Sequence, residues 1–344
     1  MVLPSTLPTP RTPDPQQAPS LRWGILGTGW IARQFTTALQ AHTAQRVVAV
    51  GSRSQESAHR FAAQFGIGRA HPSYDALVAD GEVDVIYVAT PHNHHHPDAL
   101  RAIAAGKHVL IEKPIALNAD QARDIQRAAH ERGVMAMEAL WTFFLPKFDV
   151  VRQLLADGAL GQIHTVLADH GQYFEPDHRI LRRDLAGGPM LDLMTYPASL
   201  ANWVLGAPSE VIARSTWASS QVTGQTAIML GHDQGAQSLL HSSVLSRTPT
   251  TAAICGSEGM ITFEPDFYMP GNFTVSDHTG RALHFTEPLL AHTGGLHFQA
   301  VDMARRIIAG ELVSAIRPLQ ESIQTMAVMD DARRQIGEVY DEER

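Results

Sequence analysis

Blocks of hydrophobic and polar positions alternate from Leu21 to about residue 140. Short apolar runs rich in β-branched residues are typical of buried strands, and the longer stretches between them are compatible with helices. A strand, a helix and a second strand in this order form a βαβ unit, which requires a parallel sheet. The pattern therefore predicts a doubly wound α/β domain over residues 21–140. The expected strands are 21–26, 46–51, 83–89, 108–111 and 134–137, and the expected helices are 31–42, 55–65, 98–105 and 119–131, with a short helix capped by Ser73.

The pattern changes at about residue 141, where helices become sparser and strand-like runs follow one another. This arrangement predicts a second, α+β domain over residues 141–344, built on a large, mainly antiparallel open sheet. Its expected strands are 163–168, 211–217, 226–230, 238–244 and 260–263, and its closing helices are 298–309 and 320–335. Residues 1–20 lack an apolar pattern and are rich in proline, serine and threonine, so we expect a disordered extension there.

Composition excludes several classes of protein. The net charge is -8, from 27 basic and 35 acidic side chains, and no basic run suggests nucleic acid as a partner. No apolar stretch has the length of a membrane span. A single cysteine, Cys255, rules out an intrachain disulfide framework, and we expect it to pack as a small, dispensable hydrophobic residue. A reducing cytoplasm is the simplest location for such a chain.

A glycine turn follows the first predicted strand. The segment Gly27-Thr28-Gly29-Trp30-Ile31-Ala32 fits the pattern G-x-G-x-x-A and opens the first helix of a βαβ unit. The first glycine permits the sharp turn, the second lets the backbone approach a pyrophosphate, and the helix N-terminus attracts the phosphate charge. The segment therefore predicts a dinucleotide-binding Rossmann domain, in which Gly27, Thr28, Gly29, Trp30 and Ile31 contact the cofactor.

The end of the second predicted strand indicates which cofactor is bound. NAD-binding domains usually place an acidic residue there to bond the ribose hydroxyls, whereas this chain has Ser52-Arg53. A guanidinium cannot accept a hydrogen bond from a hydroxyl but suits a 2′-phosphate. We therefore expect NADP to be preferred. The alternative is that Arg53 is a solvated surface residue and that NAD is bound.

Four further segments resemble the Gfo/Idh/MocA family of oxidoreductases. The stretch from Ala105 to Pro114 closely resembles its "AGKHVxxEKP" signature, and Thr90 to His95 resembles its "TPxxxH" segment. Gly187 to Asp192 resembles its "GGxxxD" motif. Met137 to Trp141, followed by Leu145-Pro146, is similar to the branch of dihydrodiol and NADP-dependent xylose dehydrogenases. The resemblance covers roughly residues 21–340.

The resemblance implies hydride transfer between nicotinamide C4 and a hydroxyl or carbonyl of a small sugar, polyol or diol. It places the catalytic lysine at Lys113 and the catalytic tyrosine at Tyr196, four residues after Asp192. Inositol dehydrogenases have histidine at the position of Tyr196. Two residues depart from the family, since Phe143 stands where close relatives often have arginine, and Met194 where many have glycine. Both flank the expected pocket, so the substrate could differ.

Hydride transfer leaves one proton to be moved on the substrate oxygen. A tyrosine suits this task if an ammonium group lowers its pKa, and Lys113 would be that group if the two domains close as in the family. Without the motif, Tyr196 would simply be a half-buried packing residue. Asp192 is expected to orient Lys113 or a substrate hydroxyl, and a helix-capping role is the alternative. Trp141 and Arg179 are weaker pocket candidates that could instead pack or pair.

Four histidines, His92, His94, His95 and His96, cluster after the fourth predicted strand. Neighbours on such a loop point in different directions and no carboxylates accompany them, so we expect no metal site. The resemblance instead implies that His95 packs beside the nicotinamide or the pyrophosphate. The complete expected cofactor set adds Thr90, His92, Glu112 and Lys113 to the glycine turn and Ser52-Arg53.

Two other functions remain open at this point. One is a non-catalytic dinucleotide-binding sensor on the same fold, because fold alone does not give function. The other is an inositol-type, NAD-dependent sugar dehydrogenase. The presence of both Lys113 and Tyr196 disfavours the sensor. The combination of Tyr196 and Arg53 disfavours the inositol-type dehydrogenase. The family resemblance also implies a homodimer or larger oligomer that associates through the open sheet of the second domain.

Overall fold

The structure is a computed structural model that describes residues 3–287 and 294–343. Contacts divide the chain into two compact units, each of which is described here by itself. The parallel-sheet unit consists of the described residues of 13–144 and 291–322. The large-sheet unit consists of the described residues of 1–12, 145–290 and 323–344.

The parallel-sheet unit is built on six parallel strands in the order β3-β2-β1-β4-β5-β6. The strand order reverses direction between β1 and β4, which is where doubly wound sheets bind ligands. The predicted doubly wound fold is therefore confirmed. The strands are β1 (Arg22–Leu26), β2 (Arg46–Gly51), β3 (Arg69–His71), β4 (Val85–Val88), β5 (His108–Glu112) and β6 (Ala136–Ala139).

Side-chain caps define several helix starts in this unit. The hydroxyls of Ser54 and Ser73 and the side-chain oxygen of Asn118 accept backbone N–H groups at the starts of α2, α3 and α5. Helix α4 begins at His95, three residues before the predicted start, because Pro97 is tolerated in a first turn. The helices of the unit are α1 (Trp30–His42), α2 (Gln55–Phe65), α3 (Tyr74–Val78), α4 (His95–Ala104), α5 (Ala119–Arg132) and α9 (His297–Ile308).

Helix α9 is distant in sequence from the rest of this unit. The sequence pattern places it in the domain of residues 141–344, yet it groups with the parallel-sheet unit and packs beside α1. The apolar face of α9 predicts that the helix is buried but not against which unit, because that choice depends on contacts far apart in the chain.

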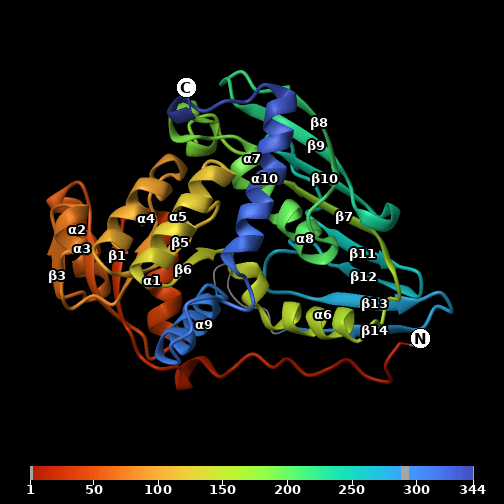
Figure 1. Ribbon diagram of the computed structural model, residues 1–344, viewed down its shortest axis with the longest axis horizontal. Coiled ribbons are helices and arrows are strands. Elements are labelled where there is room, and N and C mark those ends of the chain that lie inside the picture. Colours follow the sequence, from red (N-terminus) through yellow and green to blue (C-terminus); the bar gives the residue numbers. More distant parts are fainter. Residues whose placement is uncertain (1–2, 288–293, 344) are drawn as a thin grey trace. The chain divides into compact units, whose positions relative to one another are not determined.

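The large-sheet unit contains eight strands in the order β14-β13-β12-β11-β7-β10-β9-β8 (Figure 1). Neighbouring strands are antiparallel except for β7 and β10, which run parallel, so the predicted mainly antiparallel sheet is confirmed. Its strands are β7 (Ile163–Gly171), β8 (Glu210–Trp217), β9 (Thr223–Gly231), β10 (Gln237–Ser243), β11 (Ala252–Gly256), β12 (Gly259–Phe263), β13 (Phe273–Asp277) and β14 (Ala282–Phe285).

One face of this sheet is covered by helices. Helix α8 (Thr195–Leu205) packs against β7 and β10, and helix α6 (Pro146–Ala156) stacks Phe148 on Phe263 of β12 with 5.4 Å between the ring centroids. The short helix α7 (Pro189–Asp192) precedes α8, and residues 323–336 of α10 (Leu319–Ile336) also belong to this unit. Cys255 lies in β11, half-buried, with its pKa raised by burial.

The N-terminal residues make contacts where we expected disorder. Arg11 donates two side-chain hydrogen bonds to Asp149 of α6, and Arg281 donates to the carbonyl oxygen of Leu3 at 2.9 Å. Leu3 is buried, and the segment runs beside α6 and β14 (Figure 1). These partners lie more than 100 residues away in sequence, so the local composition of residues 1–20 does not reveal them.

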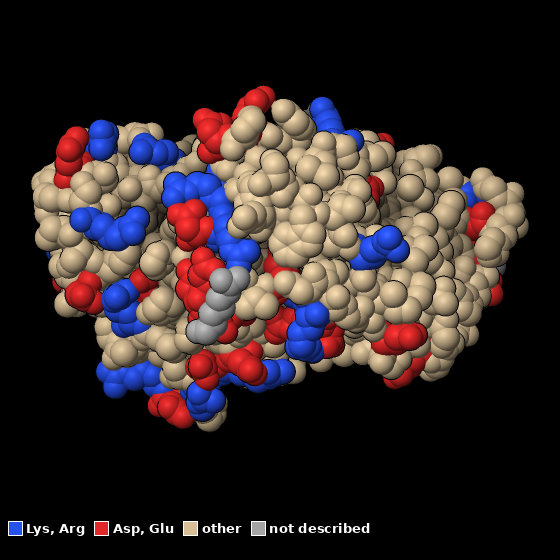
Figure 2. Space-filling view, turned by 90° about the horizontal axis from the view of Figure 1, so that it is seen from above, with Lys and Arg blue, Asp and Glu red and all other residues tan. Residues whose placement is uncertain are grey.

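The surface charge and the length of the apolar helices are the properties that nucleic-acid and membrane partners would depend on. On the face shown in Figure 2, basic and acidic side chains are intermixed, without a continuous basic stripe among the described residues. No helix in the described part of the chain is long and apolar enough to cross a bilayer.

A buried amine lies at the start of α6. Lys147 is 1% exposed, and its Nζ is 5.7 Å from the ring centroids of both Phe148 and Phe263. Burial lowers the pKa of this lysine to about 8, and the carboxylate of Glu287 offsets only part of the effect. The folded state therefore disfavours the ammonium form.

We expect Lys147→Met to raise the free energy of unfolding at pH 7 by about 2–3 kcal/mol, since each pKa unit corresponds to ~1.4 kcal/mol. The unfolded chain binds this proton up to a higher pH than the folded chain does. The stability of the wild type should therefore rise between pH 8 and the pKa of an ordinary lysine, and its difference from Lys147→Met should shrink. Denaturant midpoints at pH 7 and pH 10 measure this, and an equal difference at both values would contradict the prediction.

Candidate functional site

The glycine turn lies between β1 and α1, at the reversal of strand order. Gly27 has φ +104°, and a Cβ there would lie 2.8 Å from the carbonyl oxygen of Ala89, so only glycine fits. Gly29 precedes α1, and a Cβ at Gly29 would meet nothing within 4 Å. The N-terminus of α1 is therefore open to an approaching phosphate, with Thr28 half-buried and Trp30 exposed beside it.

Ser52 and Arg53 lie at the end of β2, as predicted. The Ser52 hydroxyl accepts a hydrogen bond from the Ser54 amide at 3.3 Å, and the Arg53 side chain is exposed. A residue missed by sequence reasoning, Tyr74, lies within electrostatic reach of Arg53. The pKa of Tyr74 is raised by burial and by the charge of Asp98, and Arg53 acts in the opposite direction. No sequence motif around Tyr74 predicts that it lies near Arg53.

The ends of β4 and β5 bring together several predicted residues. The ring nitrogens of His95 lie 2.7 Å from the carbonyl oxygen of Pro114 and 2.8 Å from that of Thr90. Glu112 is buried, receives a hydrogen bond from the Tyr87 hydroxyl, and accepts the backbone N–H of Lys113 at 3.2 Å. The half-buried Lys113 therefore follows a fixed strand end.

Two other histidines of this segment have different neighbours. The Nε2 atom of His96 lies 3.6 Å from an oxygen of Asp124, whereas His92 meets the ring of His95 edge-on at 5.7 Å. Burial lowers the pKa of His96. Among the residues that the structure describes, no group of three or more His, Cys, Asp or Glu side chains could hold a metal ion.

Trp141 and Phe143 are buried in the 3-10 turn Trp141–Phe144. The guanidinium of Arg317 lies 5.4 Å from the centroid of the Phe143 ring, and it donates to Glu138 at 2.9 Å. Phe143, a departure from the family pattern, therefore provides a cation–π surface for an arginine that comes from another part of the chain.

The large-sheet unit contains Asp192 and Tyr196. Asp192 ends α7, and its carboxylate lies 3.0 Å from Nη2 of the half-exposed Arg179. A capping role for Asp192 is not found, since α8 starts after Met194 and has no side-chain cap. Gly188 has φ +114°, which lets the chain turn into α7. Two predicted pocket residues, Asp192 and Arg179, are thus paired.

Tyr196 is buried in a cluster of three rings. Its ring centroid lies 5.4 Å from that of His170 and 4.5 Å from that of Tyr268, and the last two stack at 4.5 Å. Gln172 donates to the Tyr268 hydroxyl at 3.2 Å. Sequence reasoning missed His170 and Tyr268. Because Val166 and Ala168 are buried, the alternation of β7, continued to residue 171, would have placed His170 on the same covered face.

Comparisons with known proteins agree with this fold. Residues 21–140 match a family model described as "Oxidoreductase family, NAD-binding Rossmann fold", and residues 148–262 match the "GFO/IDH/MocA C-terminal domain". The trans-1,2-dihydrobenzene-1,2-diol dehydrogenase of Xenopus laevis is 32% identical over 326 residues, which cover 93% of this chain and 99% of that protein.

Solved structures share this fold. A 3-ketoreductase from Actinomadura kijaniata, solved with NADP and TDP-benzene, is 27% identical with a TM-score of 0.81, covering 92% of this chain and 98% of its own. The aldose–aldose oxidoreductase of Caulobacter crescentus, solved with glycerol, is 24% identical with a TM-score of 0.82, covering 94% and 100%. The chain thus belongs to the Gfo/Idh/MocA family, and it is an oxidoreductase with an NAD-binding Rossmann domain followed by the family's C-terminal domain.

Proposed function

We propose that the protein is an NADP-preferring dehydrogenase or reductase of a small polyhydroxylated substrate, a sugar, polyol or cyclic diol. The observation that carries this proposal is the position of Lys113, at the carboxyl end of β5 in the sheet whose β1–β4 reversal holds the glycine turn. Ligands of doubly wound sheets bind along this edge. The named relatives act on diols and the solved neighbours include sugar oxidoreductases, which supports the substrate class.

In this proposal Tyr196 is the general acid and base, and Lys113 lowers its pKa once both reach the same substrate. Asp192, held by Arg179, orients a substrate hydroxyl, while Trp141 contributes to the pocket. The Actinomadura 3-ketoreductase was also solved as a tyrosine-to-phenylalanine and as a lysine-to-alanine variant. The choice of these variants supports a role for a tyrosine and a lysine. The cofactor contacts are the predicted set from the glycine turn, Ser52-Arg53, Thr90, His92, His95, Glu112 and Lys113.

Oxidation or reduction of NADP(H) and NAD(H) with a panel of aldoses, polyols and trans-diols tests the proposed activity. Turnover with at least one member of the panel is expected, and the same panel with myo-inositol tests the inositol-type alternative. Tight cofactor binding without turnover on any substrate would favour a dinucleotide sensor instead.

For cofactor choice, we expect Arg53→Ala to weaken NADP(H) binding by about 1.5–3 kcal/mol, a roughly 10- to 150-fold rise in Kd, because one charge-assisted contact is lost. NAD(H) binding should change little. Fluorescence titration measures both constants, and Arg60→Ala, an exposed arginine of α2, is the matched control. Equal losses for the two cofactors would remove Arg53 from the phosphate-binding role.

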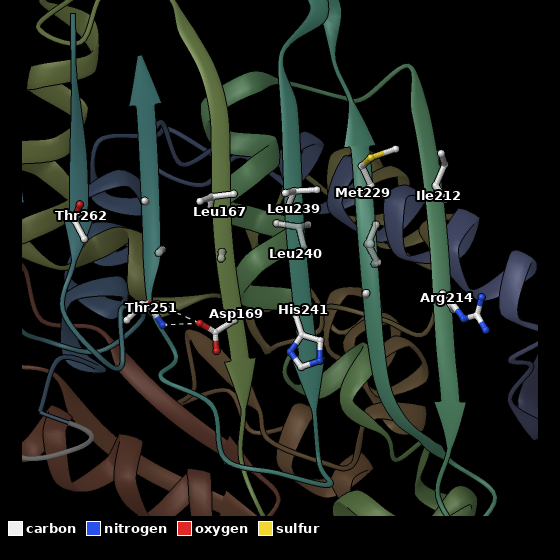
Figure 3. Close-up of a pocket in the computed structure, with 15 residues that line it drawn as sticks. Leu167, Asp169, Ile212, Arg214, Met229, Leu239, Leu240, His241, Thr251 and Thr262 are labelled. Carbon is white, nitrogen blue, oxygen red and sulfur yellow. Dashed lines mark hydrogen bonds between the residues drawn. The ribbon is translucent and has the colours of Figure 1, made fainter. Parts of the chain in front are cut away.

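The open face of the large sheet is the proposed dimer interface. Leu167, Leu239, Met229 and Ile212 lie in register across β7, β10, β9 and β8 and project from the sheet in Figure 3. Leu167, Leu239 and Ile212 are 40%, 48% and 46% exposed. A contiguous apolar row of this kind is typical of a protein interface. A two-fold dimer would cover the same row on both copies.

Leu239→Glu should convert the dimer into monomers, because it places a charge at the centre of the apolar row. Ile308→Glu, at an exposed apolar position on α9, should leave the dimer intact. Size-exclusion chromatography with light scattering distinguishes monomers from dimers. If the Leu239→Glu protein remained a dimer, the apolar row would not be the interface. We place the protein in the cytoplasm, which suits a chain with one cysteine.

A further inference from the structure

His95 is the first residue of α4 and is 1% exposed. Its Nδ1 atom lies 2.7 Å from the carbonyl oxygen of Pro114, and its Nε2 atom lies 2.8 Å from that of Thr90. Both distances are those of ordinary N–H···O hydrogen bonds. The ring therefore bridges the segment after β4 and the segment after β5.

The two partners restrict the protonation of the ring. A backbone carbonyl oxygen can only accept a hydrogen bond, and a neutral imidazole carries a hydrogen on one nitrogen only. In either neutral tautomer a nitrogen lone pair would face an oxygen lone pair at less than 3 Å. The imidazolium satisfies both contacts because each nitrogen then donates.

We infer that His95 is a positioning residue, an imidazolium whose two N–H groups hold the carbonyls of Thr90 and Pro114 and thereby fix Lys113 at the edge of the sheet. Pro114 directly follows Lys113, so holding the Pro114 carbonyl restrains the segment that carries the amine. This inference rests on the proposed role of Lys113, but the state of the ring is tested independently of it.

Several titratable and charged groups around α4 have partners of their own. Asp98, one turn along α4, receives a hydrogen bond from Arg101, and Asp124 of α5 pairs with His96. Glu112 of β5 accepts a hydrogen bond from the Tyr87 hydroxyl. On α3, Asp75 pairs with Arg101, while Tyr74 lies within reach of Arg53. On the preceding turn, His92 meets His95 edge-on.

Burial and the positive end of the α4 dipole both oppose a charge on this ring, and the two carbonyl dipoles offset them. The edge formed by the ends of β1, β4 and β5 faces an anionic dinucleotide in doubly wound folds. A buried cation held by two carbonyl dipoles adds a fixed positive potential there. His95 then supports the cofactor through charge and through the two loops.

Nitrogen-15 NMR of histidine-labelled full-length protein with NADP⁺ bound tests the ring directly. The His95 signals are identified by their loss in the His95→Gln spectrum. At about pH 8, where an ordinary histidine is neutral, both ring nitrogens of His95 should still carry protons. One protonated and one unprotonated nitrogen at that pH would overturn the inference.

Kinetics test the positioning role. His95→Gln keeps a side-chain donor for one carbonyl only, so kcat should fall by roughly 10- to 100-fold while the substrate KM changes less than about 3-fold, as expected for misplaced catalytic groups. The matched control, His96→Gln, should keep the wild-type kcat. A wild-type kcat in His95→Gln would overturn the positioning role.

The two proposals fail in different ways. Full turnover by Lys113→Ala and Tyr196→Phe would reject the proposed acid/base pair. The protonation of His95 in the wild-type spectrum would still be decided by the NMR result.

Discussion

Tyr196→Phe is expected to lower the rate of hydride transfer by roughly 10²–10⁴-fold, the range for loss of a general acid or base. The substitution removes one hydroxyl and keeps a ring that can still contact His170 and Tyr268. Folding and cofactor affinity should therefore be preserved. Single-turnover measurements with an active substrate give the rate, and a fluorescence titration gives the cofactor Kd.

A matched control lies in the same ring cluster. Tyr268→Phe also removes one buried phenol hydroxyl, which receives a hydrogen bond from Gln172, but should slow the reaction far less. Lys113→Ala should be about as damaging as Tyr196→Phe, and the double variant should not multiply the two losses, because the groups act as one unit.

The pH profile provides a second readout for the same pair. In the reduction direction the rate should decline as pH rises, because the substrate oxygen must receive a proton from the general acid. If Tyr196→Phe left the rate and the pH profile unchanged, Asp192 or His95 would become the proton carrier to test.

Arg317→Met should destabilise the parallel-sheet unit by about 3–5 kcal/mol, the effect of leaving a buried partner charge uncompensated. Arg317 is fully buried and Glu138 is 1% exposed, with a nitrogen–oxygen distance of 2.9 Å. Glu138 also accepts hydrogen bonds from the Ile115 amide and the Ser322 hydroxyl, so its carboxylate would remain buried. Calorimetry and denaturant midpoints measure the loss.

The double variant Arg317→Met/Glu138→Leu separates charge from packing. Removing both charges should recover much of the lost stability, because an apolar pair of similar volume often replaces a buried ion pair without loss. If the double variant were as unstable as Arg317→Met alone or less stable, the lost contacts of Arg317 with the Phe143 ring and its neighbours would account for the effect.

Local signals predicted the parts of the site that depend on short segments. Gly27 and Arg53 need only the strand and turn around them, so both positions can be predicted from short segments. The role expected of Lys113 rests instead on the resemblance of its segment to the family signature. The surroundings of Arg53 cannot be predicted in this way, because Tyr74, which lies within electrostatic reach of Arg53, belongs to the segment after another strand.

Contacts between distant segments explain the remaining differences. Arg317 lies 179 residues from Glu138, and no periodicity links the two positions. The strand predicted from the sequence ends at residue 168, whereas β7 continues to Gly171, so the pattern does not place His170 beside Tyr196. The parallel pairing of β7 with β10 is likewise a long-range choice within a sheet whose other neighbours are antiparallel.

The path of the chain also constrains how it can fold during synthesis. The parallel-sheet unit uses residues 13–144 and then receives its last segment from residues up to 322. At ~5–20 residues per second, a ribosome needs roughly 10–35 s to cover that interval. Throughout this time Glu138 lacks Arg317, and the surface of α1 that contacts α9 is uncovered. The nascent unit is therefore expected to expose the Glu138 carboxylate and an apolar surface until residues up to 322 have emerged, and such apolar surface makes a folding intermediate prone to aggregate.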